Sequence, residues 1–160
     1  MAASLFVSVQ EGAAVRVCRD FVRLRTERPL QFIDLTELVD ERVRRSGVRE
    51  GVATVQSRHT TAAVLVNENE PLLLHDLRSA LERAAPRHLP YRHDDFAQRA
   101  AVAPDEPANG HAHCQALFLR ASETLGVADG RPRLGRWQSI FLVELDGPRT
   151  RTLAVTVLGT

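Results

Sequence analysis

Apolar and polar positions alternate along much of the chain, which is typical of half-buried strands. Strands are predicted over Leu5–Gln10, Val15–Arg25, Gly51–Ser57, Ala62–Val66, Trp137–Leu145 and Thr150–Leu158. Glu11-Gly12 joins the first two strands and predicts a hairpin. The polar stretch His59-Thr60-Thr61 follows the third strand and predicts a bend or bulge, after which the strand continues as Ala62–Val66.

Three segments indicate helices. The first follows Phe32-Ile33-Asp34 and ends at Ser46-Gly47, and the second begins at Pro71. A short third helix is predicted from Asn109, as its N-cap, to about Arg120. The apolar stripes of the two longer helices are Leu35, Leu38, Val39 and Val43 in the first, and Leu73, Leu74, Leu77 and Leu81 in the second.

Residues 86–107 break these patterns. They contain four prolines and many charges without periodicity, which predicts a long irregular loop of the kind that often has a functional role. Near the C-terminus, Asp146-Gly147-Pro148 has the turn chemistry of a hairpin that joins the last two strands. The pattern shows no internal repeat and no second core, so residues 1–160 are predicted to form one strand-rich α+β domain with about three helices.

Composition and charge narrow the class of protein. The 160 residues are 44% hydrophobic and 26% charged with a net charge of +1, which favours a globular protein and provides no basic field for nucleic acid. No stretch approaches the roughly 18 apolar residues of a membrane helix, and the N-terminus lacks a signal-peptide pattern. A soluble, cytoplasmic protein is therefore expected. All 21 basic residues are arginine, which excludes a lysine Schiff base.

Three histidines stand in polar motifs that can form a site. His59 lies between two apolar strands, where either an exposed strand end or the face of a site explains it. His111 and His113 form an H-x-H pair, whose rings share a face on a strand but diverge by about 200° on the predicted helix. Metal ligation by the three histidines as an open site and simple polar lining of a pocket both remain open.

The end of the chain contributes a second group of candidates. Arg149 and Arg151 are two residues apart on a predicted strand and therefore point to one side, where two guanidinium groups can bind phosphate or carboxylate. Glu144 lies across the predicted turn and can orient Arg149 or bind a site cation. Cross-strand pairing of the arginines with Glu144 and other acids is the structural alternative. Glu68, before the second helix, fits helix capping, with a site role as the alternative.

Six motifs occur in order along the chain: His59-Thr60-Thr61-Ala62-Ala63, Asn67-Glu68, Tyr91-Arg92-His93-Asp94-Asp95, Asn109-Gly110-His111-Ala112-His113, Leu134-Gly135-Arg136-Trp137-Gln138 and Glu144-Leu145-Asp146-Gly147-Pro148-Arg149-Thr150-Arg151. Together they resemble the YjbQ-like family, also described as secondary thiamine-phosphate synthases. The resemblance runs from about residue 5 to the C-terminus, and G-x-W-Q with D-G-P-R is its most specific part. The Ala/Pro-rich stretch Ala101–Pro107 departs from the pattern, so no role is carried over between Asp95 and Asn109.

The resemblance implies a β-sandwich of mainly antiparallel strands with helices packed outside. It also implies a homotrimer with sites near the subunit contacts. The implied activity is a weak thiamine-phosphate synthase reaction, in which a hydroxymethylpyrimidine diphosphate and a thiazole phosphate are joined and pyrophosphate is released. This activity can be secondary to another main role of the protein.

Residue chemistry and resemblance together predict one small site for a phosphorylated molecule. The expected catalytic residues are His59, His111 and Glu144, and the expected substrate contacts are Thr60, Asn109, Gln138 and Arg149. A divalent metal, Zn or Mg, would be held by His59, His111 and His113 and would neutralise a leaving pyrophosphate. Two alternatives stand beside this prediction: a non-enzymatic trimeric protein that binds a metal or an anion, and a metal-dependent hydrolase.

Overall fold

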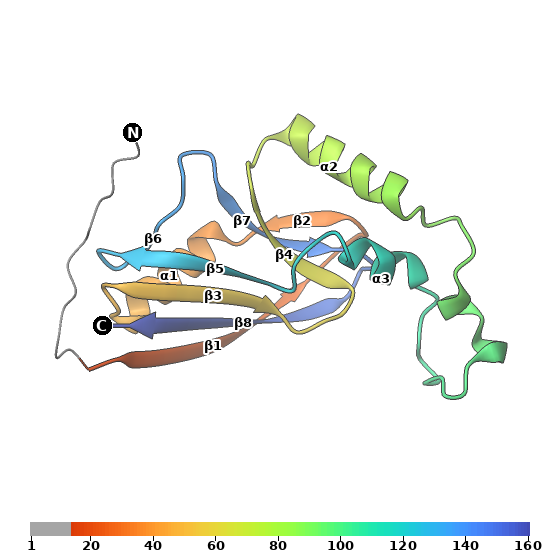
Figure 1. Ribbon diagram of the computed structural model, residues 1–160, viewed down its shortest axis with the longest axis horizontal. Helices are drawn as coiled ribbons and strands as arrows, with labels where there is room; N and C mark the ends of the chain where they lie inside the picture. The colour runs from red at the N-terminus through yellow and green to blue at the C-terminus, as the bar shows by residue number, and fades with distance from the viewer. Residues whose placement is uncertain (1–13) are drawn as a thin grey trace, which may run out of the picture.

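The computed structural model describes residues 14–160, which form eight strands and three α-helices (Figure 1). In chain order the elements are β1 (Arg16–Arg25), β2 (Gln31–Asp34), α1 (Thr36–Ser46), β3 (Gly51–Ser57), β4 (Ala62–Asn67), α2 (Pro71–Ala84), the 3-10 turns η1 (Arg92–Asp94) and η2 (Phe96–Gln98), α3 (Gly110–Ala116), β5 (Ser122–Ala128), β6 (Arg131–Pro132), β7 (Ser139–Glu144) and β8 (Thr150–Gly159). The predicted strand Leu5–Gln10 lies outside the described residues.

The strands form two antiparallel sheets that pack face to face. Sheet A has the order β1-β8-β3-β5-β6, and sheet B has the order β2-β7-β4. Figure 1 shows α2 and α3 along sheet B on the side away from sheet A. This arrangement confirms the predicted α+β fold of mainly antiparallel strands, with α2 and α3 packed outside sheet B. The helix α1 instead packs on the inner face of sheet A.

The strand β7 explains why sheet B can lie between sheet A and two helices. Its residues Ile140 and Leu142 join the core with the α1 residues Val39 and Val43 and with the inner face of sheet A. The alternate residues, of which Phe141 is the largest, pack in a second cluster with α2 and α3. A strand buried on both faces needs a continuous apolar run rather than an alternating one, and Ile140-Phe141-Leu142-Val143 is such a run.

Two predicted connections are different in the structure, because the chain crosses between the sheets at both. β3 belongs to sheet A and β4 to sheet B, so Ala62–Val66 is not a continuation of the same strand. Likewise β7 pairs with β2 and β4 whereas β8 pairs with β1 and β3, so the predicted hairpin at Asp146-Gly147-Pro148 is wrong. Turn residues specify a local reversal of the chain, but the strand partners that decide between a hairpin and a crossing are distant in sequence.

The remaining differences concern short elements. The strands β2, β5 and β6 were not among the predicted ones, and α3 ends at Ala116 rather than near Arg120. The last sheet B strand begins at Ser139, which leaves Trp137 in a turn before it. None of the helices within residues 14–160 has the length and apolar character to cross a membrane.

The outer face of sheet A carries exposed apolar side chains. Val17 pairs with Leu158 and Leu158 with Val52, so these three side chains form one row across β1, β8 and β3. Their exposed fractions are 63%, 40% and 37%, and Phe21 on the same face of β1 is 54% exposed. No helix of residues 14–160 lies over this face (Figure 1).

A close backbone contact at the edge of this row gives a test of the strand register. Gly51 and Gly159 are partners in the β3–β8 ladder, and a Cβ on Gly51 would lie 2.0 Å from the carbonyl oxygen of Leu158. We expect Gly51→Ala to lower the free energy of unfolding by about 1–3 kcal/mol, as overpacking does, in urea titrations. Gly126→Ala in β5 is the control, because the nearest atom that its Cβ would meet is the Cβ of Arg133 at 4.0 Å. Equal stability of the two variants would contradict the register.

Candidate functional site

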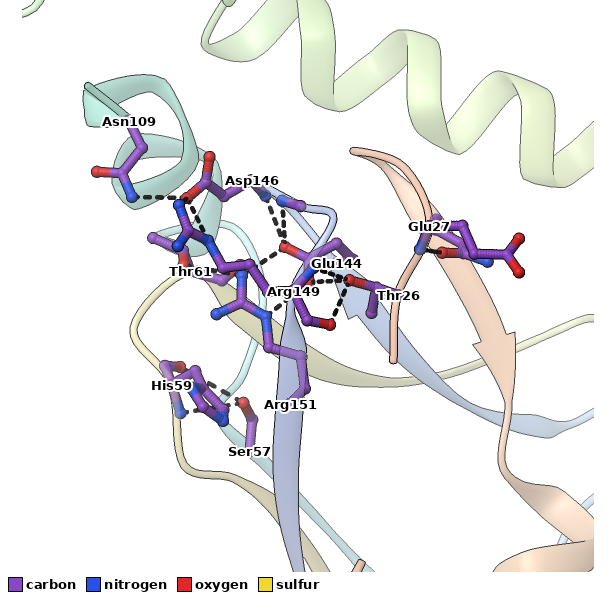
Figure 2. Close-up of polar contacts among 12 residues, drawn as sticks. Thr26, Glu27, Ser57, His59, Thr61, Asn109, Glu144, Asp146, Arg149 and Arg151 are labelled. Carbon is purple, nitrogen blue, oxygen red and sulfur yellow. Dashed lines mark hydrogen bonds and ion pairs between the residues drawn. The ribbon is translucent and has the colours of Figure 1, made fainter. Parts of the chain in front are cut away.

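Three chain crossings between the sheets meet at one end of the sandwich. Thr26 follows β1, Thr61 precedes β4 and Glu144 ends β7. Figure 2 shows these residues around Arg151, which projects from the beginning of β8. The sequence brings polar residues together here because each crossing must leave its sheet, and the backbone groups that are freed need partners.

Glu144 is the centre of this cluster. Its carboxylate accepts hydrogen bonds from Arg151 Nε at 2.6 Å and Nη2 at 2.5 Å, and from Thr26 Oγ1 at 2.9 Å. The backbone N–H groups of Asp146 and Gly147 donate to it at 2.9 and 2.7 Å. Glu144 is fully buried, so its oxygens face protein donors rather than a ligand. Any catalytic contribution of Glu144 therefore acts through the groups that it positions.

The charge of Glu144 is stabilised despite its burial. Burial by itself raises the pKa of this carboxyl, but the hydrogen bond from Arg151 and the backbone N–H groups of Gly147 and Asp146 outweigh it, and the pKa is lowered. A carboxyl with a lowered pKa in the folded chain stabilises the fold above its ordinary pKa, and this stabilisation is lost as the pH falls through the folded value. The cluster is therefore ionised and intact at neutral pH.

Asp146 forms a second ion pair beside the first. Its Oδ2 accepts from Arg149 Nε at 3.0 Å and Nη2 at 2.7 Å, and from Asn109 Nδ2 at 2.8 Å. Arg87 approaches the other oxygen at 3.8 Å and donates to the Asp146 carbonyl at 3.3 Å. Asp146 thus connects the β7–β8 crossing to the start of α3 and to the beginning of the 86–107 loop.

The predicted arrangement of the two arginines is only partly what the structure shows. Both guanidinium groups lie at this end of the molecule (Figure 2). Arg151, however, is buried and pairs with Glu144, whereas Arg149 pairs with Asp146 and its side chain is 37% exposed. The expected Glu144–Arg149 pair is therefore wrong. It rested on a hairpin geometry that the crossing does not have.

His59 lies on the β3–β4 crossing, and its ring is fixed by the backbone. Its Nε2 accepts a hydrogen bond from the Thr152 N–H at 2.7 Å, which leaves the proton on Nδ1. Burial and the nearby charge of Arg151 lower the pKa of His59. His59 is therefore neutral at pH 7 and can offer a ligand its Nδ1–H as a donor.

His111 and His113 diverge on α3, as their spacing on a helix predicts. His111 is 3% exposed, and its Nε2 has no hydrogen-bond partner among residues 14–160. Burial and the charge of Arg87 lower the pKa of His111, so the ring is neutral. His113 instead packs edge-on against His93 of the 86–107 loop, with ring centroids 4.7 Å apart. The charge of Asp146 acts against the lowering of the pKa in both rings, so both histidines lie within its range.

The predicted metal ligands do not form a set within the part of the chain that the structure describes. No three histidine, cysteine, aspartate or glutamate side chains of residues 14–160 are grouped so that they could hold an ion. His59 Nε2 already accepts a backbone hydrogen bond and His113 packs on His93. The metal site stays a prediction, and no catalytic step is assigned to a metal below.

The predicted substrate contacts divide between two ends of sheet B. Asn109 is buried at the Asp146 cluster, and Thr60 is exposed on the β3–β4 crossing beside it. Gln138 precedes Ser139, which pairs with Asn67, whereas Glu144 pairs with Ala62. The five residue steps from Ser139 to Glu144 span roughly 16 Å at the usual rise of a strand. One chain therefore does not bring Gln138 to the Arg149 cluster.

Four residues of the cluster were not predicted as site residues, and one of them, Asp146, was expected only as part of a turn. Thr26 accepts the Arg149 N–H at 2.8 Å and donates to Glu144, and Thr61 accepts Arg151 Nη2 at 3.1 Å on its hydroxyl. Arg87 reaches Asp146 from the irregular loop. The motif His59-Thr60-Thr61 contained a signal for Thr61. Thr26 is an isolated threonine after a strand and Arg87 is one arginine among 21, so neither has a sequence pattern that indicates a site.

A family model described as "UPF0047 protein YjbQ-like" matches residues 20–160. The chain belongs to the YjbQ-like UPF0047 family. Among its relatives, a UPF0047 protein of Methanothermobacter thermautotrophicus is 40% identical over 148 residues, which are 92% of this chain and 96% of the relative. The UPF0047 protein YugU of Bacillus subtilis is 30% identical over 86% of this chain and 97% of its own length.

Solved structures of the family agree with the fold. A crystal structure of a "YbjQ-like protein of unknown function" from Sulfolobus solfataricus superposes with a TM-score of 0.83 at 32% identity, over 92% of this YjbQ-like chain and all of that one. A hypothetical protein from Aeropyrum pernix gives a TM-score of 0.78 at 35% identity, over 89% of this chain and 98% of the other. The UPF0047 family is one of unknown function, so the activity must be argued from the site.

The Glu144–Arg151 pair can be tested by its effect on stability. Glu144→Gln leaves the Arg151 guanidinium buried without its counter-charge, and we expect the free energy of unfolding to fall by about 3–5 kcal/mol. Thr26→Val leaves the ion pair in place and removes the hydroxyl that donates to the same carboxylate and accepts the Arg149 N–H. A loss of about 1–2 kcal/mol is expected for it. Urea unfolding at pH 7 measures both. A Glu144→Gln loss no greater than that of Thr26→Val would show that the ion pair does not hold this end together.

Proposed function

We propose that this YjbQ-like chain is a cytoplasmic enzyme that binds a phosphorylated small molecule at the Asp146–Arg149 cluster. Its proposed activity is a weak thiamine-phosphate synthase reaction, which joins hydroxymethylpyrimidine diphosphate to thiazole phosphate and releases pyrophosphate. The family resemblance suggests this reaction, and the chemistry of the cluster is compatible with it. Another main activity at the same site is compatible with the proposal.

The observation that carries the proposal is a partly exposed arginine held beside buried polar atoms that lack partners. Asp146 fixes Arg149 through Nε and Nη2, and Nη1 has no partner among residues 14–160. Asn109 donates to Asp146, and its Oδ1 is buried without a hydrogen bond within the same residues. His111 Nε2, two residues further along α3, is buried without one as well. Buried polar atoms are nearly always satisfied, so unsatisfied ones beside a positioned guanidinium favour a ligand site.

Such a cluster can assist departure of a pyrophosphate without a protein nucleophile. The bond between the pyrimidine methylene carbon and the diphosphate oxygen breaks, and its electron pair leaves with the pyrophosphate. The thiazole nitrogen then supplies the electron pair of the new C–N bond. Arg149, with Arg87 3.8 Å from the shared Asp146, can neutralise the charge that develops on the leaving group. The neutral His59 and His111 can donate or accept hydrogen bonds to orient the substrates.

Release of pyrophosphate distinguishes this proposal from its alternatives. The synthase reaction requires both substrates and yields thiamine phosphate together with pyrophosphate. A metal-dependent hydrolase would instead release phosphate or pyrophosphate from either compound alone and would stop when the metal is chelated. A binding protein would release nothing from either. Assays with both substrates, with each alone, and with chelator therefore separate the three functions.

The binding role of Arg149 is tested by its removal. We expect Arg149→Ala to weaken pyrophosphate binding by about 1.5–3 kcal/mol, the usual value of a hydrogen bond to a charged group. Isothermal titration calorimetry well below the melting temperature measures this affinity. Since the change also leaves the buried Asp146 short of a partner, the melting temperature is expected to fall as well. Affinity is therefore the deciding quantity.

The matched control is Arg133→Ala, which removes an exposed arginine after β6 and lowers the net charge equally. It should leave pyrophosphate affinity within about twofold of the unchanged protein, because only general attraction is lost. Unchanged affinity in Arg149→Ala, or an equal loss in both variants, would remove the basis for the proposed phosphate site.

We also propose a homotrimer that buries the outer face of sheet A. The row Val17, Leu158 and Val52, with Phe21 beside it, is an apolar patch of the kind that marks protein contacts. His59 of the candidate site bonds to Thr152 of the same sheet, so a partner on this face would lie near the site. That the proposed oligomer has three subunits rests on the family resemblance.

Light scattering tests the assembly. We expect a mass three times the 17.8 kDa of one chain and expect Phe21→Glu to shift the protein toward monomer, because a charge would be buried at the contact. The control is Leu72→Glu, which places the same charge at a 75% exposed leucine on α2 and should leave the mass unchanged. A monomer mass for the unchanged protein at micromolar concentration would refute the proposal.

A further inference from the structure

A second polar pocket lies at the other end of sheet B, remote from the Asp146 cluster. It has a volume of about 310 Å³ and is formed where β4 ends and β7 begins. Its lining includes Glu68 and Glu70 from the segment before α2, and Arg136, Trp137 and Gln138 from the turn before β7. Gln138, one of the expected substrate contacts, lies here, but the function proposed above uses none of the residues of this pocket.

The turn before β7 exposes Trp137, the only tryptophan of the chain, to solvent. Trp137 is 62% exposed. The turn around it is closed by two hydrogen bonds, from Gln138 N to Gly135 O at 3.0 Å and from Gly135 N to Gln138 Oε1 at 2.8 Å. Large aromatic side chains are normally buried or used in contacts. A rigid turn that presents an indole to solvent therefore points to binding.

The indole already holds one cation. The guanidinium carbon of Arg136 lies 4.6 Å from the centroid of the Trp137 ring, which is within the range of a cation–π contact. An arginine from the same turn covers one side of the ring. The electron-rich ring thus attracts flat cations, and its open side is available to another one.

The two glutamates of the pocket differ in what they can do. The Glu70 carboxylate caps α2 and accepts from the N–H groups of Leu72 and Leu73 at 2.9 and 2.7 Å. Glu68 is half-buried, and its carboxylate has no hydrogen bond or ion pair with any residue in the range 14–160. Its segment is anchored by Asn69, which donates to Asp34 at 2.8 Å. Glu68 is therefore a positioned negative charge that a ligand can pair with.

We infer that this pocket binds a flat organic cation of the amidinium or guanidinium class, with its face on Trp137 and its N–H groups toward Glu68. A planar cation with N–H donors matches both a carboxylate and an aromatic face. An anion is disfavoured because two glutamates outnumber the one arginine of the lining, and a metal ion would find only one free carboxylate. The inference does not depend on the proposed thiamine-phosphate activity, because the two sites share no residue.

The single tryptophan gives a specific readout, since the chain has only one indole N–H signal in a proton–nitrogen NMR spectrum. Benzamidine, protonated at neutral pH, is the probe, and the isosteric neutral benzamide and anionic benzoate are the comparisons. We expect benzamidinium to move the indole signal saturably. Benzamide should bind at least about tenfold more weakly, and benzoate should have no effect, because the charge on Glu68 is the source of selectivity.

Glu68→Gln keeps the shape of the side chain and removes its charge, and it should weaken benzamidinium binding about tenfold or more. The control is Glu27→Gln at an exposed position between β1 and β2, which changes the net charge equally and should leave affinity unchanged. An unshifted indole signal, equal binding of benzamidinium and benzamide, or undiminished binding in Glu68→Gln would overturn the inference. So would an indole signal that moves only with protein concentration, because a second copy of the chain would then occupy the pocket.

Discussion

The buried ion pair between Glu144 and Arg151 is the interaction on which the functional end of the molecule depends. It joins the last strand of sheet B to the last strand of sheet A, and Thr26 adds the end of β1 through the same carboxylate. Burying two charges is costly unless every donor and acceptor finds a partner. Here the partners are backbone and side-chain groups of the three crossings, so the cost of burial is met only when all three are in place. The partly exposed Arg149 lies beside this ion pair, and its backbone is held by Thr26.

The sequence predicted the elements of the fold better than their connections. Val39 and Val43 at helical spacing and the alternation in Gly51–Ser57 are local signals, and both elements were found. The crossing at Asp146–Pro148 was taken for a hairpin because the same turn residues serve both, whereas the strand partners are set by packing across the whole chain. β5 was missed because only Leu125 and Val127 of its residues are buried and Gly126 stands between them.

The candidate site was predictable where motif and chemistry agreed. Asn109 and Arg149 were expected together, and they meet at Asp146. Gln138 was expected with them but lies at the far end of sheet B, because it precedes β7 whereas Glu144 ends the same strand. The length of the predicted strand Trp137–Leu145 already separated the two residues. Thr26 was missed for a related reason: a threonine acquires its role only from a carboxylate 118 positions away. Long-range pairing, rather than residue type, limited the prediction.

The shared carboxylate also has a consequence for motion. A crossing that bonded only to its own neighbours could detach and reclose by itself on a fast timescale. At this end, releasing any one crossing leaves the Glu144 carboxylate or the Arg151 guanidinium in a dry interior without its hydrogen-bond partners. Partial opening therefore costs nearly as much free energy as complete opening. Amide protons of Thr26, Leu145 and Gly147, which donate to Arg149, Thr61 and Glu144, are therefore expected to exchange with solvent as one cooperative unit. The free energy of this exchange should be close to that of global unfolding. The end that carries Arg149 would thus move as one rigid unit rather than as a hinge.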